Sequence, residues 1–450
     1  MGNIGFEPII GVGGESAPVV RTLPRVCALG DSITAAAINS SSTTMSFRGF
    51  GFMAWLPSLL NQRISYEAAD NFGVAGDTTA MMMERLPSVL ARTPTWCVVL
   101  AGTNDVPFVV GGSLSYEKVI ANLTTIYETL LAARIGVIAV PILNRETFTG
   151  FDATQIASAQ RVIGRINAWI ASYAAGREGG FRVIDPRSVW TDATGLPTTD
   201  TAYDGLHPNT NGAFLIAQSI ATQIDGDIPK LDRRFLDPFD LWNATDNPTG
   251  NLLTNGELAG TGGTLTATDV TGDVPTSWTF VRTPTTALGG VTTISKEART
   301  DGVPGEWTVV EFASTSGSFG LCNFNLRQIL TVDDVTISAG DEIDFSAEIV
   351  WSNTAGMLGA MLQATENDGS TNLFYSAVSG PALSATSIVV PASGSGLFKA
   401  PRFTVRPAGG VGSRTIQFIM QVAANTDQAG GTTARVKFGG AQARKVTPAT

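Results

Sequence analysis

The chain contains the stretch Arg25-Val26-Cys27-Ala28-Leu29-Gly30-Asp31-Ser32-Ile33-Thr34 near its amino end. A short apolar run followed by glycine is typical of a buried strand that ends in a tight turn. The stretch therefore predicts a first strand with Ser32 just beyond its carboxyl end, which is where ligands bind in an open parallel sheet. A plain turn would contain the same Gly-Asp-Ser triplet, so the triplet alone indicates a nucleophile only weakly.

Strand and helix patterns alternate after this stretch. Further buried-strand runs occupy residues 96–100, 136–140 and 181–185, and helical spacing of apolar residues occupies 119–131, 154–175 and 213–224. The last of these helices is expected to have Pro208 in its first turn, because proline suits that position. This alternation predicts a doubly wound parallel sheet covered by helices on both faces.

His207 is the only histidine in the 450 residues, and it stands in Asp204-Gly205-Leu206-His207-Pro208. The Asp204 carboxylate, three positions upstream, can hold the imidazole in one tautomer. A lone histidine more often fills a turn or a half-buried gap. The catalytic interpretation therefore depends on a nucleophile and on donors for an oxyanion elsewhere in the chain.

Two further strand ends supply candidate donors. Gly76, in Asn71-Phe72-Gly73-Val74-Ala75-Gly76-Asp77-Thr78, offers a backbone N–H with no Cβ in front of it. Asn104, in Ala101-Gly102-Thr103-Asn104-Asp105, offers a side-chain amide, a contact worth roughly 3–4 kcal/mol to a developing oxyanion. Taken separately, a turn glycine and an Asx turn explain these residues equally simply.

In this order, the blocks GDS, NFGVAGDT, GTND and DGLHP resemble the SGNH (GDSL-type) hydrolase superfamily over about residues 22–228. The resemblance implies a flavodoxin-like fold with Ser32 as nucleophile and with Asp204 and His207 completing a triad. It also implies an oxyanion hole made of the Ser32 N–H, the Gly76 N–H and the Asn104 side chain. The Gly-x-Ser-x-Gly elbow of the α/β-hydrolases is absent around Ser32. The segment Pro141–Arg145 offers no clear counterpart of the donors that some subfamilies carry there, so no substrate contacts in it follow from the resemblance.

Composition limits the partners and cofactors. The net charge of −10 argues against nucleic acid, whose phosphates require a basic face. No apolar run is long enough to span a membrane. The three cysteines lack the spacing of zinc ligands and there is no histidine cluster, so neither a metal nor another cofactor is expected. No signal peptide is visible at the amino end.

The residue pattern changes near residue 229, where a charged and then turn-rich segment is followed by alternating apolar residues in place of helical spacing. We expect an N-terminal extension (1–21), a catalytic domain (22–228), a linker (229–250) and a β-domain (251–450). In the β-domain, apolar residues alternate at Ile343, Phe345, Ala347, Ile349 and Trp351, and again over 416–422 and 436–438. Period two over several short segments predicts an antiparallel jelly-roll sandwich. Its opening, 251–257 with 277–280, resembles carbohydrate-binding modules.

Several smaller features admit two interpretations. Trp278, Trp307, Trp351 and Tyr375 are candidates for stacking on sugar rings, although core packing is preferred for each. Met81-Met82-Met83 is preferred as helix core over a wall for an acyl group. Ser40–Thr44 is either a mobile loop over the cleft or a flexible tract with no role in the site. Leu231, Phe235 and Trp242 are candidates for a seal between the domains.

The function expected from these observations is a carbohydrate O-acetyl esterase acting on an acylated polysaccharide, with the β-domain holding the polymer. The chain also resembles phage tail-associated deacetylases, and this resemblance implies a protein that acts outside a host cell or as part of a virion. If the resemblance does not hold, the expected location is the cytoplasm. That resemblance allows a homo-oligomer, a trimer in a phage tail protein. The alternatives are a broad short-chain esterase or thioesterase, and a receptor-binding or adhesion protein with a vestigial hydrolase site. Because every candidate site residue precedes residue 229, the catalytic domain alone is expected to act on small aryl acetates.

Overall fold

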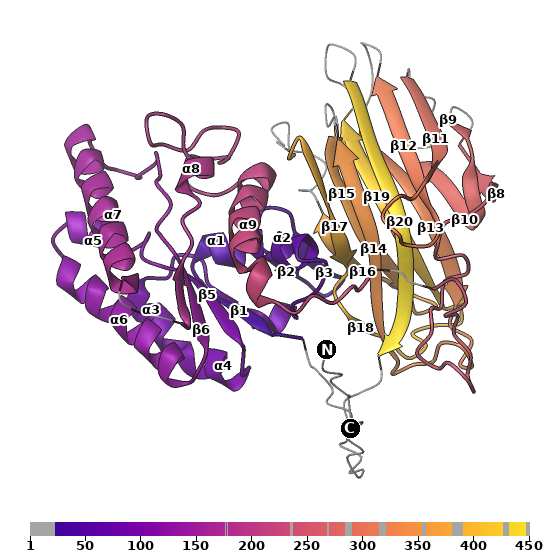
Figure 1. The fold of residues 1–450 in the computed structure, drawn as a ribbon, viewed down its shortest axis with the longest axis horizontal. Helices are drawn as coiled ribbons and strands as arrows, with labels where there is room; N and C mark the ends of the chain where they lie inside the picture. Colours follow the sequence, from indigo (N-terminus) through magenta and orange to yellow (C-terminus); the bar gives the residue numbers. More distant parts are fainter. Residues whose placement is uncertain are drawn as a thin grey trace, which may run out of the picture.

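The computed structural model describes residues 23–175, 177, 179–234, 237–267, 270–283, 290–314, 321–352, 357–379, 390–425 and 432–446. The expected N-terminal extension and Phe235 lie outside the described residues. Figure 1 shows an α/β unit, in indigo and magenta, beside a stack of long strands in orange and yellow. An α/β domain followed by a β-sandwich is the predicted fold class, and it is confirmed.

The α/β unit is built on a five-stranded parallel sheet of order β4-β1-β5-β6-β7. The strands are β1 (Val26–Gly30), β4 (Asn71–Gly73), β5 (Trp96–Leu100), β6 (Gly136–Val140) and β7 (Phe181–Val183). Both faces of β1 are covered, because Val26 and Ala28 belong to one apolar cluster and Cys27 and Leu29 to another. Its continuous apolar run reflects this double burial.

Helices cover each face of the sheet. One face carries α1 (Ser32–Ala35), α2 (Phe52–Leu59), α8 (Arg187–Trp190) and α9 (Thr210–Ile224). The other carries α3 (Thr79–Glu84), α4 (Leu86–Ala91), α5 (Val106–Val110), α6 (Tyr116–Ala132) and α7 (Ala153–Ala174). Short 3-10 turns occupy Ala68–Asp70 (η1) and Asp225–Asp227 (η2). The expected position of Pro208 is wrong, because α9 begins at Thr210 after Asn209, whose side chain accepts from Gly212 N–H at 2.9 Å.

The β-sandwich consists of two facing sheets. An eight-stranded sheet has the order β2-β3-β16-β15-β19-β13-β10-β8, and a seven-stranded sheet has the order β17-β14-β20-β12-β11-β9, with β18 paired to β14. Their C-terminal members are β8 (Gly262–Leu265), β9 (Val270–Gly272), β10 (Val274–Thr283), β11 (Gly290–Ala298), β12 (Glu306–Ser314), β13 (Leu321–Thr331), β14 (Glu342–Ser352), β15 (Met357–Asn367), β16 (Asn372–Ser379), β17 (Ser393–Lys399), β18 (Phe403–Thr404), β19 (Thr415–Asn425) and β20 (Thr432–Val446). The predicted alternation is confirmed in β14, where the residues from Ile343 to Trp351 that were assigned to one face are all buried.

Two strands of the eight-stranded sheet come from the N-terminal part of the chain. The hairpin of β2 (Ile38–Ser40) and β3 (Thr44–Arg48) lies at the sheet edge, where β3 pairs in parallel with β16. Ser40 and Thr44 are strand residues, so only the three residues between them form the loop that the sequence suggested for the whole of Ser40–Thr44. The strand that holds β3 in place lies more than 300 residues further along the chain, so no local pattern could reveal the pairing.

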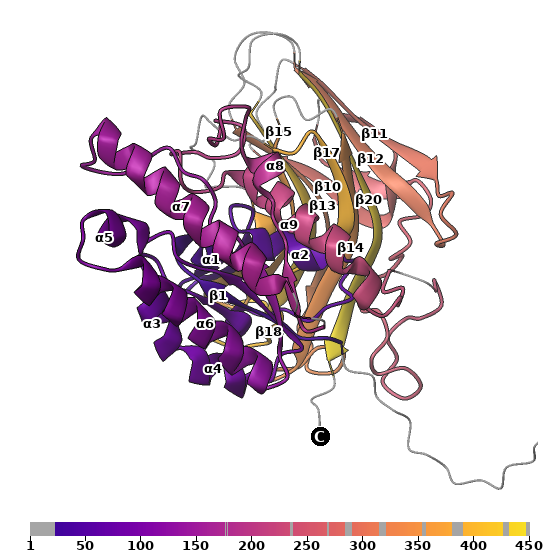
Figure 2. The same ribbon diagram turned by 60° about the vertical axis from the view of Figure 1, so that its left-hand side comes forward.

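An aromatic cluster joins the two parts of the molecule. Trp55 on α2 lies 5.3 Å from Phe214 of α9, 5.8 Å from Trp351 of β14 and 6.1 Å from Phe398 of β17, between ring centroids. Figures 1 and 2 show α2 and α9 between the parallel sheet and the sandwich. Of the candidates for a seal, Leu231 is 48% exposed and does not form one. Trp242 lies under Lys445 and packs, partly buried, against the apolar cluster that the two parts share.

Candidate active site

Ser32 is the first residue of α1, directly after β1. The side chain of Asp31 caps this short helix by accepting from Ile33 N–H at 2.9 Å. Two glycines allow the close approach of neighbouring strand ends. A Cβ on Gly30 would lie 2.7 Å from the Leu100 carbonyl oxygen, and one on Gly73 would lie 2.2 Å from the Ala35 nitrogen. The ends of β1 and β4 are thereby packed against α1, and the end of β1 also lies close to the end of β5.

Ser32, His207 and Asp204 form a continuous chain of hydrogen bonds. The Ser32 Oγ lies 2.9 Å from His207 Nε2, and His207 Nδ1 lies 2.7 Å from Asp204 Oδ2. The other Asp204 oxygen accepts from the backbone N–H groups of His207 at 2.7 Å and Leu206 at 3.0 Å. Partial burial alone would raise the pKa of Asp204, but these bonds from His207 and Leu206 hold it below its ordinary value. The carboxylate is thus ionised and fixed where it can orient the imidazole.

The loop after β6 supports the Asp204 turn. Thr147 Oγ1 donates to the Asp204 carbonyl at 2.5 Å, and Glu146 N–H donates to the Gly205 carbonyl at 2.8 Å. Gly205 adopts a φ of +76°, which favours glycine in this turn. Glu146 and Thr147 therefore position the loop that carries Asp204 and His207. They directly follow Pro141–Arg145, the segment in which the sequence predicted no substrate contacts.

The two predicted oxyanion donors lie at one turn. Gly76 is exposed with a φ of +84°, and the Asn104 Nδ2 donates to the carbonyl of Asp77 at 3.0 Å. An amide nitrogen carries two hydrogens, so this bond orients the Asn104 side chain and leaves its second N–H available. Both donors follow strands adjacent to β1 in the sheet. Their roles in catalysis remain predictions.

Two residues that the sequence analysis did not select connect these segments. Asp105 accepts from Thr79 N–H at 2.9 Å and from Thr79 Oγ1 at 2.6 Å, which ties the Asn104 turn to the start of α3. Arg85 forms an ion pair with Asp77 and donates to the Gly30 carbonyl at 3.1 Å. Asp77 and Asp105 each stand beside a predicted donor in the sequence, and this adjacency was the only available signal.

Asp31 is a buried carboxylate beside the nucleophile. It is fully shielded from solvent, and its Oδ2 has no hydrogen-bond partner among the described residues. Burial raises the pKa of Asp31 to about 6, although the bond from Ile33 and the charges of His207 and Arg145 act in the opposite direction. Asp31 thus places a titratable carboxyl group next to Ser32 in the sequence and within electrostatic reach of His207.

Arg145 is also buried near the hydrogen-bonded chain. Its Nε donates to the Thr147 carbonyl at 2.7 Å, and its guanidinium lies 4.3 Å from the centroid of the Phe148 ring. Burial lowers the pKa of Arg145, whereas the charges of Asp204 and Asp31 raise it. Arg145 thus supplies positive charge close to two carboxylates.

Comparison with known proteins identifies the α/β unit. Residues 28–213 match the model of the GDSL-like Lipase/Acylhydrolase family. These residues form a GDSL-like acylhydrolase domain. A comparison with curated proteins gives no match.

Solved structures similar to this chain include a GDSL-like lipase from Bacteroides thetaiotaomicron, with 20% sequence identity and a TM-score of 0.36. That similarity covers 46% of this chain and 90% of the lipase chain. Another is a catalytic mutant of an acetylxylan esterase from Geobacillus stearothermophilus, with 19% identity and a TM-score of 0.34, covering 45% of this chain and 94% of that one. The family match gives no support to the interpretation as a phage tail-associated deacetylase.

Within the described residues of the acylhydrolase domain and the sandwich, no group of three or more His, Cys, Asp or Glu side chains is arranged to hold a metal ion. None of the described helices is long and apolar enough to cross a membrane.

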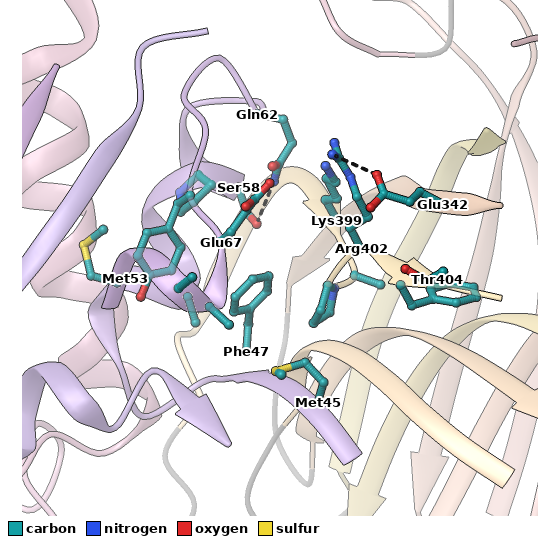
Figure 3. Close-up of a pocket in the computed structure, with 18 residues that line it drawn as sticks. Met45, Phe47, Met53, Ser58, Gln62, Glu67, Glu342, Lys399, Arg402 and Thr404 are labelled. Carbon is teal, nitrogen blue, oxygen red and sulfur yellow. Dashed lines mark hydrogen bonds and ion pairs between the residues drawn. The ribbon is translucent and has the colours of Figure 1, made fainter. Parts of the chain in front are cut away.

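A cavity of about 310 Å³ lies between the acylhydrolase domain and the sandwich. Figure 3 shows Met45 and Phe47 of β3 on one side of it and Arg402, Lys399 and Glu342 on the other. The cations at its rim are paired, since Arg402 contacts Asp344 at 2.9 Å and Glu342 at 3.8 Å, and Lys399 contacts Asp344 at 2.8 Å. Ser32 and His207 do not line it, so it is a space at the domain interface and separate from the candidate active site.

The four aromatic residues considered for sugar stacking are covered by other side chains. Trp278 and Trp351 are buried, Trp307 lies under the guanidinium of Arg299, and Tyr375 stacks on Phe403. The preference for packing over sugar binding thus agrees with their surroundings.

The methionine cluster is divided, because Met82 is buried in the core while Met81 is exposed. An aromatic side chain that the sequence analysis did not select, Tyr203, lies beside His207 and is 58% exposed. Its position next to Asp204 in the sequence was the one signal that could have identified it.

Proposed function

We propose that this protein is a serine esterase that removes O-acetyl groups from a polysaccharide. The observation that carries the proposal is the chain of hydrogen bonds from Ser32 through His207 to Asp204. His207 would take the proton of the Ser32 hydroxyl as the oxygen attacks the ester carbonyl, and Asp204 would stabilise the imidazolium. The Ser32 N–H, the Gly76 N–H and the Asn104 amide would bind the tetrahedral oxyanion. The ester C–O bond then breaks, and His207 returns the proton to the sugar oxygen, which leaves as a hydroxyl group. The acetyl group stays on Ser32 until water hydrolyses it to acetate.

The openness of the site supports a small acyl group on a large alcohol. The side chains of His207 and Asp204 are 26% and 41% exposed, and Gly76 is exposed. A long acyl chain would require an enclosed apolar pocket for binding energy. A polymer that carries acetyl groups requires instead that the nucleophile be reachable from the surface. The resemblance of residues 251–257 and 277–280 to carbohydrate-binding modules supports a polysaccharide as that polymer.

A second candidate is a broad short-chain esterase or thioesterase. Val74, Met81 and Phe108 are exposed apolar side chains on the segments that follow β4 and β5, where the oxyanion donors lie. Such side chains would cover an acyl chain of a few carbons. The third candidate, a binding protein with a vestigial site, is disfavoured because a binding module has no need for an intact hydrogen-bonded Ser32, His207 and Asp204.

Two measurements separate these candidates. Rates on p-nitrophenyl esters from acetate to octanoate should fall steeply beyond acetate, and acetate should be released from at least one member of a panel of acetylated polysaccharides. Ser32→Ala serves as the control and should abolish both. Similar rates from acetate to hexanoate without acetate release from any polymer would favour the broad esterase. No Ser32-dependent turnover at all would contradict the proposal.

A further inference from the structure

A strip of side chains leads away from the candidate active site along the surface. The Tyr203 ring stacks on the His207 ring with centroids 5.7 Å apart and an angle of 16° between the planes. The Phe50 ring lies 6.3 Å from the Tyr203 ring, and the guanidinium of Arg48 lies 5.2 Å from the Phe50 centroid. We call Tyr203, Phe50 and Arg48 the aromatic strip. It connects the imidazole with a positive charge through two aromatic rings.

Arg48 has no carboxylate partner among the residues that the structure describes. By contrast, Arg85, Arg92 and Arg187 each contact at least one carboxylate, whereas Arg48, like Arg165, lies over an aromatic ring. Burial raises the pKa of the Tyr203 phenol, and the positive charge of Arg48 acts against that rise. The guanidinium thus lies over the Phe50 ring, and no acid of the described chain uses its donors.

The backbone around the strip is held in place. Arg48 is the last residue of β3, which is paired with β16 of the sandwich, and its N–H donates to the Ala37 carbonyl at 2.8 Å. Gly51 N–H donates to the Arg48 carbonyl at 3.0 Å, and Trp55 Nε1 donates to the Gly49 carbonyl at 2.8 Å. The turn that carries Phe50 is thus fixed before any substrate arrives, which reduces the entropy lost on binding.

We propose that the aromatic strip is a subsite for an acidic sugar ring, with the apolar face of the ring on Tyr203 and Phe50 and its carboxylate on Arg48. A planar guanidinium binds a carboxylate through two parallel hydrogen bonds, and aromatic rings provide an apolar surface with a defined geometry. A neutral sugar would leave Arg48 without a partner. The inference rests on the proposed function and narrows its substrate to a polysaccharide that contains uronic or other carboxylated sugars.

The test compares two pairs of acetate esters that differ in charge. The first pair is a methyl glucuronoside and a methyl glucoside that carry one O-acetyl group at the same position. The second pair is 4-acetoxybenzoate and its neutral amide, which contain no sugar. For each pair, kcat/KM is measured with the full chain at low and high salt for the wild type, Arg48→Gln, Arg48→Lys and Arg165→Gln. Arg165 is the matched control because it is an exposed arginine that contacts the Tyr116 ring on α6.

The wild type should prefer the anionic member of each pair by about tenfold, the size expected for a charge-assisted contact that is partly exposed. The preference should shrink at high salt, fall to about one in Arg48→Gln, remain partly in Arg48→Lys and persist in Arg165→Gln. Phe50→Ala should raise KM for the glucuronoside about fivefold or more with a smaller change in kcat.

The outcomes also separate this inference from the proposed function. Hydrolysis of both sugar esters with no preference, or a preference that survives in Arg48→Gln, would overturn the subsite and leave the carbohydrate esterase intact. Hydrolysis of neither sugar ester, with an Arg48-dependent preference within the benzoyl pair, would overturn the carbohydrate part of both proposals. In that case Arg48 would select an anionic ester of another class.

Discussion

At the scale of single residues, substitution of Asp204 tests most clearly how the imidazole of His207 is oriented. Asp204→Asn removes the charge but keeps the shape of a group that contacts the ring and two backbone N–H groups of the loop. An amide favours the wrong tautomer of His207, so we expect kcat to fall by roughly 10³-fold or more, with little change in KM. Steady-state kinetics on an aryl acetate measures this change, and a loss below tenfold would contradict the assigned role.

Asp31 makes a second prediction, which concerns stability and pH. Its pKa of about 6 in the folded protein lies above the ordinary 3.8, so the folded state holds a proton that the unfolded state releases between these pH values. The free energy of unfolding should therefore fall as the pH rises through this range. At pH 8 the buried carboxylate costs about 3 kcal/mol.

Asp31→Asn should raise the denaturation midpoint at pH 8 and flatten its change between pH 4 and 6, because the amide keeps an oxygen for the helix cap without a charge to bury. The same variant should lose activity, since a negative charge near the site that would stabilise the positive charge formed during the reaction is gone. Asp246→Asn, at an exposed position, is the control. An unchanged pH profile of stability in Asp31→Asn would show that burial of this carboxylate is not costly.

The sequence was sufficient to select the three residues proposed to react and insufficient to select the residues that support them. Ser32, Asp204 and His207 stand in recognisable blocks, and the structure brings them into hydrogen-bond contact. Arg85 and Arg145 act through contacts between segments distant in the chain. Such contacts depend on tertiary packing, which no local pattern encodes.

At the scale of secondary-structure elements, the start of α3 and the turn after β5 are locked together by Thr79 and Asp105. Thr79→Val keeps the shape of the side chain but removes the hydroxyl, which leaves one oxygen of a buried carboxylate and the Asn122 amide without a partner. We expect a loss of about 1–3 kcal/mol in stability. We also expect kcat to fall about tenfold, because the Asn104 donor is less well fixed.

Thr125→Val is the matched control, since its hydroxyl donates only to the Ala121 carbonyl on the exposed side of α6. Denaturation and aryl acetate hydrolysis measured together would distinguish the two effects. If Thr79→Val is stable and its kcat is unchanged, the hydrogen bonds between Thr79 and Asp105 do not position the Asn104 donor.

Elements with strong periodicity were predictable, and the hairpin was not. The strands β1, β5 and β6 are continuous apolar runs, and α6 and α7 carry apolar residues at helical spacing. By contrast, β2 and β3 are short and contain polar residues such as Asn39 and Ser46. They are strands because β16 pairs with β3 and β3 pairs with β2, and the first of these pairings is a property of the assembled fold.

At the scale of the whole molecule, the two parts are more closely joined than the sequence suggested. The apolar cluster on one face of the parallel sheet is continuous with the core of the sandwich through Trp55, Phe214, Trp351 and Phe398. Because all the candidate site residues precede residue 229, the sequence predicted that the catalytic domain alone would hydrolyse small aryl acetates. A chain ended after Ile228 would lose the partner of β3 and expose Trp55, so the structure favours the opposite outcome.

We therefore expect the shortened chain to be insoluble or to bind an apolar dye strongly, and to hydrolyse aryl acetates at less than about a tenth of the wild-type rate. Supplying residues 229–450 as a separate chain during expression should restore part of the activity. Size-exclusion chromatography, dye binding and aryl acetate kinetics measure these properties. A soluble monomeric fragment with full activity would show that the hairpin and the aromatic cluster are dispensable for catalysis.

The most direct test of the central claim is the identity of the residue that becomes covalently modified. The full chain is treated with a fluorophosphonate, which reacts with an activated serine, and the adduct is located by peptide mass spectrometry. We predict one adduct, on Ser32, that is absent from Ser32→Ala and forms far more slowly in Asp204→Asn. An adduct on another serine, or hydrolysis of aryl acetates that persists in Ser32→Ala, would contradict the account.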